Sequence, residues 1–172
     1  AFIWTMFFPT PIPSAVRWVS GVLVLVPLYT ALVILFSNYG PGYLLFALVI
    51  VWAADGGAYF AGKRFGRVKL APSISPGKTW EGVIGGLLLV VLLSVLAGNW
   101  ADTSIAVLVP FCLAVASISI VGDLTVSMFK RTAGVKDSGS LFPGHGGVLD
   151  RVDSVAAAAP LFTLGIGWLG LV

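Results

Sequence analysis

The residues of this chain that could do chemistry gather in one segment, residues 127–153. The whole chain has only ten Lys/Arg, seven Asp/Glu and one His, and 58% of its residues are hydrophobic. Because charge is costly to keep in so apolar a chain, its concentration predicts a functional site. The ionisable residues of the segment are Lys130, Arg131, Lys136, Asp137, His145, Asp150, Arg151 and Asp153.

Asp123 lies just upstream, inside the apolar run SISIVGDLTVSMF. An ionised carboxylate at the centre of a membrane span costs about 2.5–3.5 kcal/mol, so such a residue is usually partnered and functional. The alternative is an Asp at a helix end, hydrated at the membrane interface. Ser127 and Lys130 follow at i+4 and i+7, so on a continuous helix all three side chains face the same way and could line one cavity.

Asp150 and Asp153 are three residues apart in LDRVDS, and a helical turn would place both carboxylates on one face. A helix N-terminus favours acidic residues through its dipole. This alternative explains one aspartate, but it explains less well why Asp150 and Asp153 occur together with Asp123. Together the three aspartates offer hard oxygen ligands. Proteins typically hold Mg²⁺ with one or two carboxylates plus substrate phosphates.

The single histidine and the single cysteine receive different interpretations. His145 sits in PGHGG, whose glycines let a ligand approach the backbone closely, and this favours a phosphate or nucleotide contact over a structural loop histidine. One His alone does not make a zinc site. Cys112 lies in the apolar run FCLAV and is interpreted as a packing residue.

The segment 75–82, SPGKTWEG, invites comparison with a phosphate-binding P-loop. That motif requires a glycine where Pro72 stands, and no strand is expected before it, so a P-loop ATPase is rejected. We expect Ser75 to be a helix N-cap with Pro76 at the first helical position. Lys78 and free backbone N–H groups would then face an anion, although a capped helix start alone would explain the pattern.

A second charged segment begins at Asp55, near the end of an apolar run. Functional and interfacial interpretations of this Asp are nearly equal. Gly56, Gly57 and Gly62 predict close helix packing. The basic residues that follow are interpreted as a fringe that contacts lipid headgroups, and they are Lys63, Arg64, Arg67 and Lys69.

The composition predicts an all-α polytopic membrane protein. Charged residues make up 10% of the chain against about 25% in soluble proteins. Its mean hydropathy is +1.03. About 20 apolar residues cross a bilayer. The basic residues are not interleaved with stacking aromatic side chains, which excludes nucleic acid. We expect a single membrane domain, residues 1–172, with spans near 15–36, 42–61, 82–97, 104–128 and 155–172.

Five spans would place all ten Lys/Arg and every acidic residue except Asp102 on one side of the membrane. The positive-inside rule makes that side cytoplasmic. Such one-sided charge argues against a non-enzymatic transporter, which would need polar groups along a path. The chain starts at Ala1 inside an apolar segment without a signal-peptide pattern, so we expect the C-terminal part of a longer protein.

Carboxylates, basic residues and glycine-rich loops at a membrane surface indicate phosphate chemistry. The sequence has no plausible Ser-His-Asp set and no reactive Cys, and a nucleophile that is already anionic needs neither. A phosphate monoester, with a second pKa near ~6, is such a nucleophile. Catalysis would then depend on positioning and on charge neutralisation by metal and Lys/Arg. Phosphoryl or nucleotidyl transfer to a lipid phosphate therefore fits the residues.

The charged segment resembles the signature of the phosphatidate cytidylyltransferase (CDP-diacylglycerol synthase) family. The matching residues show no departure from it, and the similarity covers roughly residues 50 to 155, including 55–66, 75–82 and 122–124. Family members are longer, with several more spans before this region. The motif residues are Ser127, Phe129, Lys130, Arg131, Lys136, Asp137, Gly139, Phe142, Pro143, His145, Gly146, Gly147, Val148, Asp150, Arg151, Val152 and Asp153.

The resemblance implies that CTP and phosphatidate react to give CDP-diacylglycerol and pyrophosphate in phospholipid biosynthesis, at the cytoplasmic face of a bacterial inner membrane. It implies Mg²⁺, with K⁺ beside it, on Asp123 and Asp150. The expected catalytic residues are Asp123, Lys130, Asp150 and Asp153. The expected substrate-binding residues are Lys78, Ser127, Arg131, Lys136, His145 and Arg151. Another CTP-dependent lipid transferase (a polyprenol kinase or an archaeal CDP-lipid synthase) is the alternative, and a homodimer is left open.

Overall fold

The computed structural model describes residues 13–100, 104–135, 138, 147 and 149–170. In this part of the chain, five helices are long and apolar enough to cross a membrane. The expectation of an all-α polytopic membrane protein is confirmed. In chain order the elements are α2 (Ser14–Ile34), the π-helical turn η1 (Leu35–Tyr39), α3 (Pro41–Phe65), β1 (Lys69–Ala71), β2 (Ser75–Thr79), α4 (Trp80–Trp100), α5 (Ile105–Thr132) and α6 (Leu149–Leu169).

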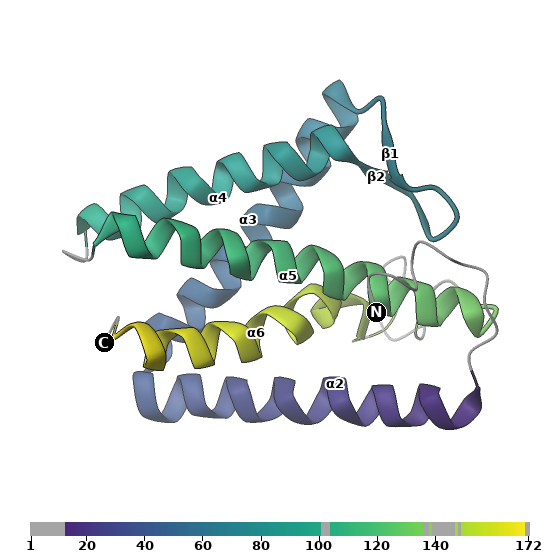
Figure 1. Ribbon diagram of the computed structural model, residues 1–172, viewed down its shortest axis with the longest axis horizontal. Helices are drawn as coiled ribbons and strands as arrows, with labels where there is room; N and C mark the ends of the chain where they lie inside the picture. Colours follow the sequence, from purple (N-terminus) through teal and green to yellow (C-terminus); the bar gives the residue numbers. More distant parts are fainter. Residues whose placement is uncertain (1–12, 101–103, 136–137, 139–146, 148, 171–172) are drawn as a thin grey trace.

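The helices form a bundle in which sequence neighbours mostly pack together. Helix α3 packs on α4, α4 on α5, α5 on α6, and α2 closes the bundle against α6 (Figure 1). Val51, Val115 and Phe162 lie in the apolar core. Cys112 is fully buried in the same core, which confirms its interpretation as a packing residue.

Glycines bring α3 and α4 into close contact. A Cβ added at Gly57 would come within 2.9 Å of the Gly86 Cα, and one at Gly62 would come within 2.9 Å of the Thr79 Oγ1. Small residues at helix interfaces let backbones approach in this way. The expectation of close packing is therefore confirmed for Gly57 and Gly62. It is wrong for Gly56, where an added Cβ would meet nothing within 4 Å, because this position faces away from α4.

Gly57→Ala is expected to destabilise the bundle, whereas the neighbouring change Gly56→Ala is not. Alanine is favoured over glycine in a helix by about 1 kcal/mol. At Gly57 that gain is outweighed by overpacking against backbone atoms, which costs about 1–3 kcal/mol. Thermal unfolding of both variants in detergent would check this. Equal melting temperatures for the two would contradict the proposed contact.

The connection between α3 and α4 is a two-stranded antiparallel hairpin, with Lys69 opposite Thr79 and Ala71 opposite Ser75. The prediction of a helix capped by Ser75, with Pro76 in its first turn, was wrong. Strand pairing satisfies this backbone, and Gly77 disfavours a helix there. Helix α4 begins only at Trp80, and the Thr79 Oγ1 accepts the N–H of Gly82 at 3.2 Å as its cap.

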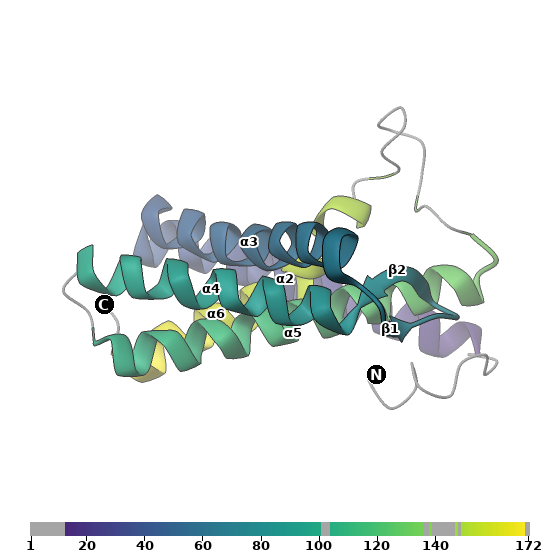
Figure 2. The same ribbon diagram turned by 90° about the horizontal axis from the view of Figure 1, so that it is seen from above.

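The hairpin, the C-terminal end of α5 and the N-terminal end of α6 all lie at one end of the bundle (Figures 1 and 2). The expectation that the two charged segments meet at the same end of the spans is confirmed for the described residues, since Arg131 of α5 donates to the Ile74 backbone oxygen of the hairpin turn. Glu81, in the first turn of α4, fixes the segment that leads from α3 into the hairpin. Its carboxylate accepts the N–H groups of Arg67 and Val68 at 3.1 and 3.2 Å.

Candidate functional site

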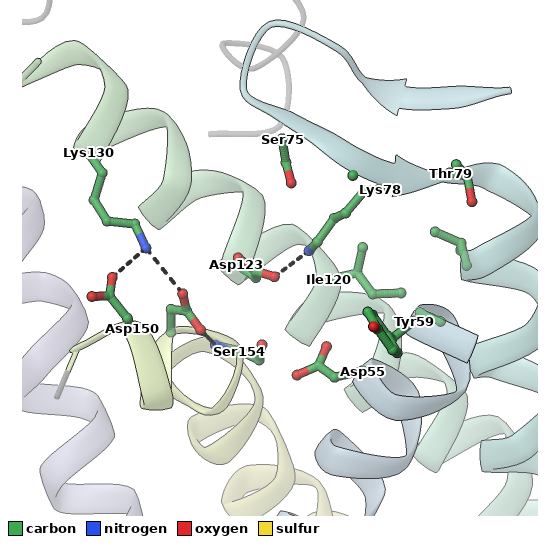
Figure 3. A pocket seen from close by; sticks show the side chains of 14 residues that line it. Asp55, Tyr59, Ser75, Lys78, Thr79, Ile120, Asp123, Lys130, Asp150 and Ser154 are labelled. Atoms are coloured by element: carbon green, nitrogen blue, oxygen red, sulfur yellow. Dashed lines mark hydrogen bonds and ion pairs between the residues drawn. The ribbon is translucent and has the colours of Figure 1, made fainter. Parts of the chain in front are cut away.

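A cavity of about 540 Å³ opens between the hairpin, α3, α5 and α6 (Figure 3). Its volume is in the range of small-molecule sites, roughly 300–1,000 Å³. Four carboxylates and two ammonium groups lie in its wall. The lining residues are Asp55, Ala58, Tyr59, Ser75, Gly77, Lys78, Thr79, Val83, Ile120, Asp123, Lys130, Asp150, Asp153 and Ser154.

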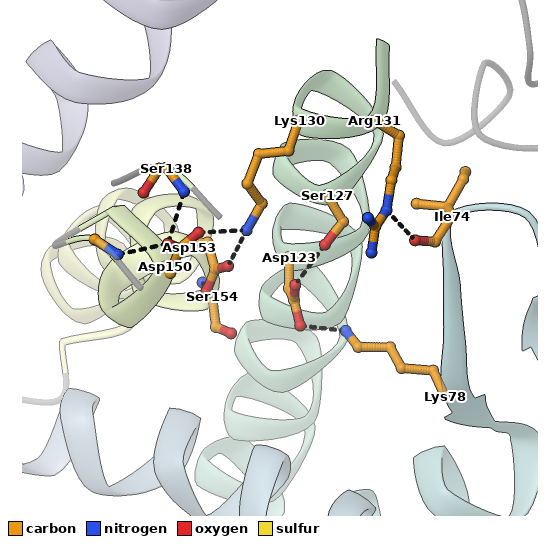
Figure 4. Close-up of polar contacts among 11 residues, drawn as sticks. Ile74, Lys78, Asp123, Ser127, Lys130, Arg131, Ser138, Asp150, Asp153 and Ser154 are labelled. Carbon is orange, nitrogen blue, oxygen red and sulfur yellow. Dashed lines mark hydrogen bonds and ion pairs between the residues drawn. The ribbon is translucent and has the colours of Figure 1, made fainter. Parts of the chain in front are cut away.

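Asp123 stands at the centre of a small polar network on α5 (Figure 4). Ser127, one turn later, donates its hydroxyl to the Asp123 Oδ1 at 3.2 Å. Lys78 reaches across from β2 and forms an ion pair with the other carboxylate oxygen. The predicted common face of Asp123 and Ser127 is confirmed. The partner of this half-buried carboxylate comes from the hairpin.

The Lys78 ammonium nitrogen is shielded from solvent. Among the described residues it has its ion pair with Asp123 and no hydrogen bond of good geometry. An ammonium carries three donors, and a buried donor without an acceptor is unfavourable. Lys78 therefore presents unused donor capacity to the cavity, as a group that receives an anionic ligand would.

Lys130 bridges the two acidic residues at the start of α6. Its Nζ lies 2.7 Å from the Asp150 Oδ1 and 3.5 Å from the Asp153 Oδ2. All three side chains are at most 14% exposed. The prediction that Asp150 and Asp153 share one helical face is confirmed, and Lys130 faces the same cavity from α5.

Asp150 is held as a charged group. Its Oδ2 accepts the backbone N–H groups of Ser138 and Gly147, both at 2.8 Å. Burial opposes ionisation, but the Lys130 ammonium and these two N–H groups outweigh it and keep the pKa of the Asp150 carboxyl well below its ordinary value. A carboxylate fixed in this way is ready to face a cation.

A close contact between α5 and α6 brings the acidic residues together. A Cβ added at Gly122 would lie 2.5 Å from the Ala157 Cβ and 3.3 Å from the backbone oxygen of Asp153. Only glycine allows this approach, and it sets Asp123 close enough to Asp153 for their charges to interact. Asp55 also interacts with Asp123 and faces Ser154 from α3 (Figure 3).

The hairpin turn is anchored to α5. Ile74 is 1% exposed and packs with Met128, with Phe129 against the same cluster. The Arg131 Nε donates to the Ile74 backbone oxygen at 3.3 Å. Arg131 was expected to bind substrate, but it is not among the residues that line the cavity. Its contact holds the turn, and with it the strand that carries Lys78.

Ile74→Ala is expected to loosen the hairpin. Truncating a buried Ile to Ala costs about 2–5 kcal/mol, and here the cost falls on the local anchor. Faster amide hydrogen exchange across residues 69–79, with the exchange of α3 unchanged, would show this. Ile84→Ala, at an exposed position on α4, is the control. Equal exchange of the hairpin in both variants would contradict the anchor.

The carboxylates that line the cavity are the groups that could hold Mg²⁺. Among the described residues, no three His, Cys, Asp or Glu side chains form a ready-made metal cluster. The carboxylates of Asp123, Asp150 and Asp153 nevertheless line one cavity, with lysines beside them. Mg²⁺ usually takes only one or two protein carboxylates and completes its shell with water and substrate phosphates. The residues therefore fit a Mg²⁺ ion shared with a phosphate-bearing substrate.

Several expected site residues are placed differently or not at all. Lys136 and His145 lie outside the described residues, and the Arg151 side chain also lies outside them, although its backbone belongs to α6. Tyr59, Thr79 and Ser154 line the cavity but were not predicted. Two of them had a local signal: Tyr59 follows Asp55 by one helical turn, and Ser154 follows Asp153 directly.

The family model and the curated relatives that match this chain are all cytidylyltransferases. The model of the cytidylyltransferase family matches residues 2–168. A phosphatidate cytidylyltransferase of Haemophilus influenzae is 52% identical over 126 residues, which are 70% of this chain and 44% of that protein. One of Pseudomonas aeruginosa is 49% identical over 146 residues, 83% of this chain and 54% of that protein. One of Staphylococcus aureus is 46% identical over 127 residues, 73% and 49% of the two chains. The chain spans about half the length of the curated relatives it matches.

Proposed function

The chain belongs to the cytidylyltransferase family, and from this premise we propose that it transfers a cytidylyl group from CTP to phosphatidate. The products are CDP-diacylglycerol and pyrophosphate, within phospholipid biosynthesis. The relatives named above carry the name phosphatidate cytidylyltransferase, which supports this choice of acceptor.

One observation carries the proposal. The cavity combines Asp123, Asp150 and Asp153 with Lys78 and Lys130 at one end of a bundle of membrane-spanning helices. Ammonium groups can neutralise a triphosphate and a lipid phosphate together. The acceptor can reach such a site without leaving the bilayer. The predicted gathering of nearly all charge on one side of the membrane supports a cytoplasmic site, in bacteria at the inner membrane.

In the proposed reaction, a phosphate oxygen of phosphatidate attacks the α-phosphorus of CTP. A new P–O bond forms, the bond from the α-phosphorus to the bridging oxygen breaks, and pyrophosphate leaves with that electron pair. The nucleophile is already an anion, so no side chain has to remove a proton. Lys78 and Lys130 orient the phosphates and offset their charge, which is the main contribution that a site of this kind makes.

Asp123 and Asp150 would hold Mg²⁺, with Asp153 beside them and K⁺ as a second cation. When bound, the metal supplies positive charge to phosphate oxygens. Lys78 pairs with Asp123 and Lys130 with Asp150, so both carboxylates are held in place before substrate arrives. Ser127 fixes the orientation of the Asp123 carboxylate through its hydrogen bond.

The test uses the purified protein in lipid nanodiscs with CTP labelled at the α-phosphorus. We expect labelled CDP-diacylglycerol and one pyrophosphate per product, both lost when Mg²⁺ is chelated. A panel of acceptors separates the alternatives: label appearing only on a polyprenol or an archaeal lipid would replace phosphatidate as the substrate. Transfer from the γ-position alone would indicate a kinase, and no metal-dependent product with any acceptor would refute the enzyme.

A further inference from the structure

A second, apolar hollow adjoins the polar cavity. It measures about 120 Å³ and lies between α4 and α5 beneath the hairpin. Leu70 and Trp80 form its hairpin end, and Leu87 and Val121 line it further along the helices. Among the described residues in its wall, the polar groups are the Trp80 indole N–H and the Ser117 hydroxyl, which donates to the Leu113 backbone oxygen at 2.7 Å and is satisfied within α5. The hollow therefore suits hydrocarbon. It is called the α4/α5 groove below.

The groove and the polar cavity are contiguous, because Val83 and Ile120 line both. Val83 projects from α4 and Ile120 from α5, just past the hairpin. On one side of Val83 and Ile120 lies the polar cavity, with Lys78 and Asp123, and on the other side lies the apolar groove. In Figure 2 the hairpin adjoins the start of α4 and lies beside the C-terminal part of α5. A molecule with a charged head and an apolar tail could cross this boundary without exposing either part to the wrong surroundings.

The groove also opens toward the outside of the bundle. Ser117, which lines the groove on α5, is exposed. Trp80 is 46% exposed where the hairpin meets α4, a position that suits the Trp enrichment found at membrane interfaces. The groove is thus open at the surface of the described helices and adjoins the polar cavity at its other side.

We propose that the α4/α5 groove holds the first methylenes of an acyl chain of the lipid acceptor, so that its phosphate can enter the cavity. The proposal rests on the proposed function for the identity of that lipid. A phosphate drawn to Lys78 pulls the start of its acyl chains out of the bilayer, and removing methylenes from apolar surroundings is costly. The groove provides those surroundings at the wall of the site. Val83 and Ile120 then act in acceptor specificity.

The first test fills the groove with Ser117→Phe and uses Ala106→Phe, at an exposed position on the same helix, as the control. The acceptors are dioleoyl phosphatidate and the short-chain dihexanoyl phosphatidate, which both carry the first methylenes of an acyl chain. We expect Ser117→Phe to lower kcat/KM about tenfold for both acceptors, as if about two methylenes lost apolar contact, and to leave the KM for CTP unchanged. No loss, a loss with the dioleoyl acceptor alone, or an equal loss in Ala106→Phe would overturn the proposal.

A second test needs neither a variant nor turnover. The unmodified protein is photolabelled with phosphatidate carrying a diazirine near the carboxyl end of one acyl chain, and with phosphatidylcholine carrying the same group. Stronger labelling of residues 80–87 and 117–124 by the phosphatidate probe supports the groove. Equal labelling by both lipids, or labelling elsewhere, refutes it. If the wild type forms no CDP-lipid, the proposed function fails, while this labelling still decides the groove.

Discussion

Lys78→Met is expected to lower kcat about 10²–10³-fold, the usual effect of removing one preorganised group that stabilises charge in a transition state. Methionine keeps an unbranched apolar stem and removes only the ammonium. In the wild type that ammonium is buried, pairs with Asp123 and has donor capacity left for a phosphate. The variant loses both the balance of the Asp123 charge and the contact with substrate.

Lys69→Met is the matched control for this change. Lys69 lies on the other strand of the same hairpin, and its side chain is exposed. Turnover with CTP and phosphatidate, measured beside the melting temperature in detergent, separates a chemical effect from unfolding. The role given to Lys78 fails if its variant keeps wild-type turnover, or if Lys69→Met loses as much.

Asp150→Asn is expected to reduce CDP-diacylglycerol formation by a similar factor of about 10²–10³, without unfolding the protein. Asparagine has the same shape, and its carbonyl oxygen can still accept one of the two backbone N–H groups that Asp150 now binds. Lys130 keeps a partner in Asp153, at 3.5 Å. What disappears is the fixed negative charge that would hold a cation.

The measurement is the rate of CDP-diacylglycerol formation over a range of Mg²⁺ concentrations. Asp102→Asn is the control variant. Asp102 is the acidic residue that lies in the sequence between the third and fourth spans, and the topology predicted from the sequence puts it alone on the opposite side of the membrane. The variant at Asp150 should remain inactive at low Mg²⁺, while the control stays normal. Normal activity of Asp150→Asn at low Mg²⁺ would remove this carboxylate from the metal site.

The sequence predicted the elements that local physics controls. Long apolar runs identify membrane-spanning helices because each backbone polar group in a bilayer must be satisfied within its own segment. The helical period then places Asp123 and Ser127 on one face, and Asp150 and Asp153 on another. Both predictions are confirmed: Ser127 donates to Asp123 one turn earlier on α5, and Asp150 and Asp153 both face Lys130 from the start of α6. Which face of a helix a residue occupies depends on the helical period alone.

Local sequence patterns gave a wrong prediction where pairing between distant segments decides the structure. Ser75 and Pro76 look like the start of a helix, but the backbone of residues 75–79 pairs with β1 instead. The energy of strand pairing comes from residues that are apart in the chain, so capping patterns do not reveal it. The hairpin also gives Arg131 a structural contact that the sequence did not reveal, because its guanidinium donates to the backbone oxygen of Ile74.

By itself, the sequence determined that this is a polytopic membrane protein with its charge at one end, and it supplied the motif of the family. Only the tertiary structure decided which cation meets which carboxylate. Lys78 reaches Asp123 because the anchored hairpin folds over α5, and Lys130 reaches Asp150, 20 residues away, because Gly122 lets α6 pack closely. Such contacts depend on the packing of whole helices, and no local sequence pattern encodes them.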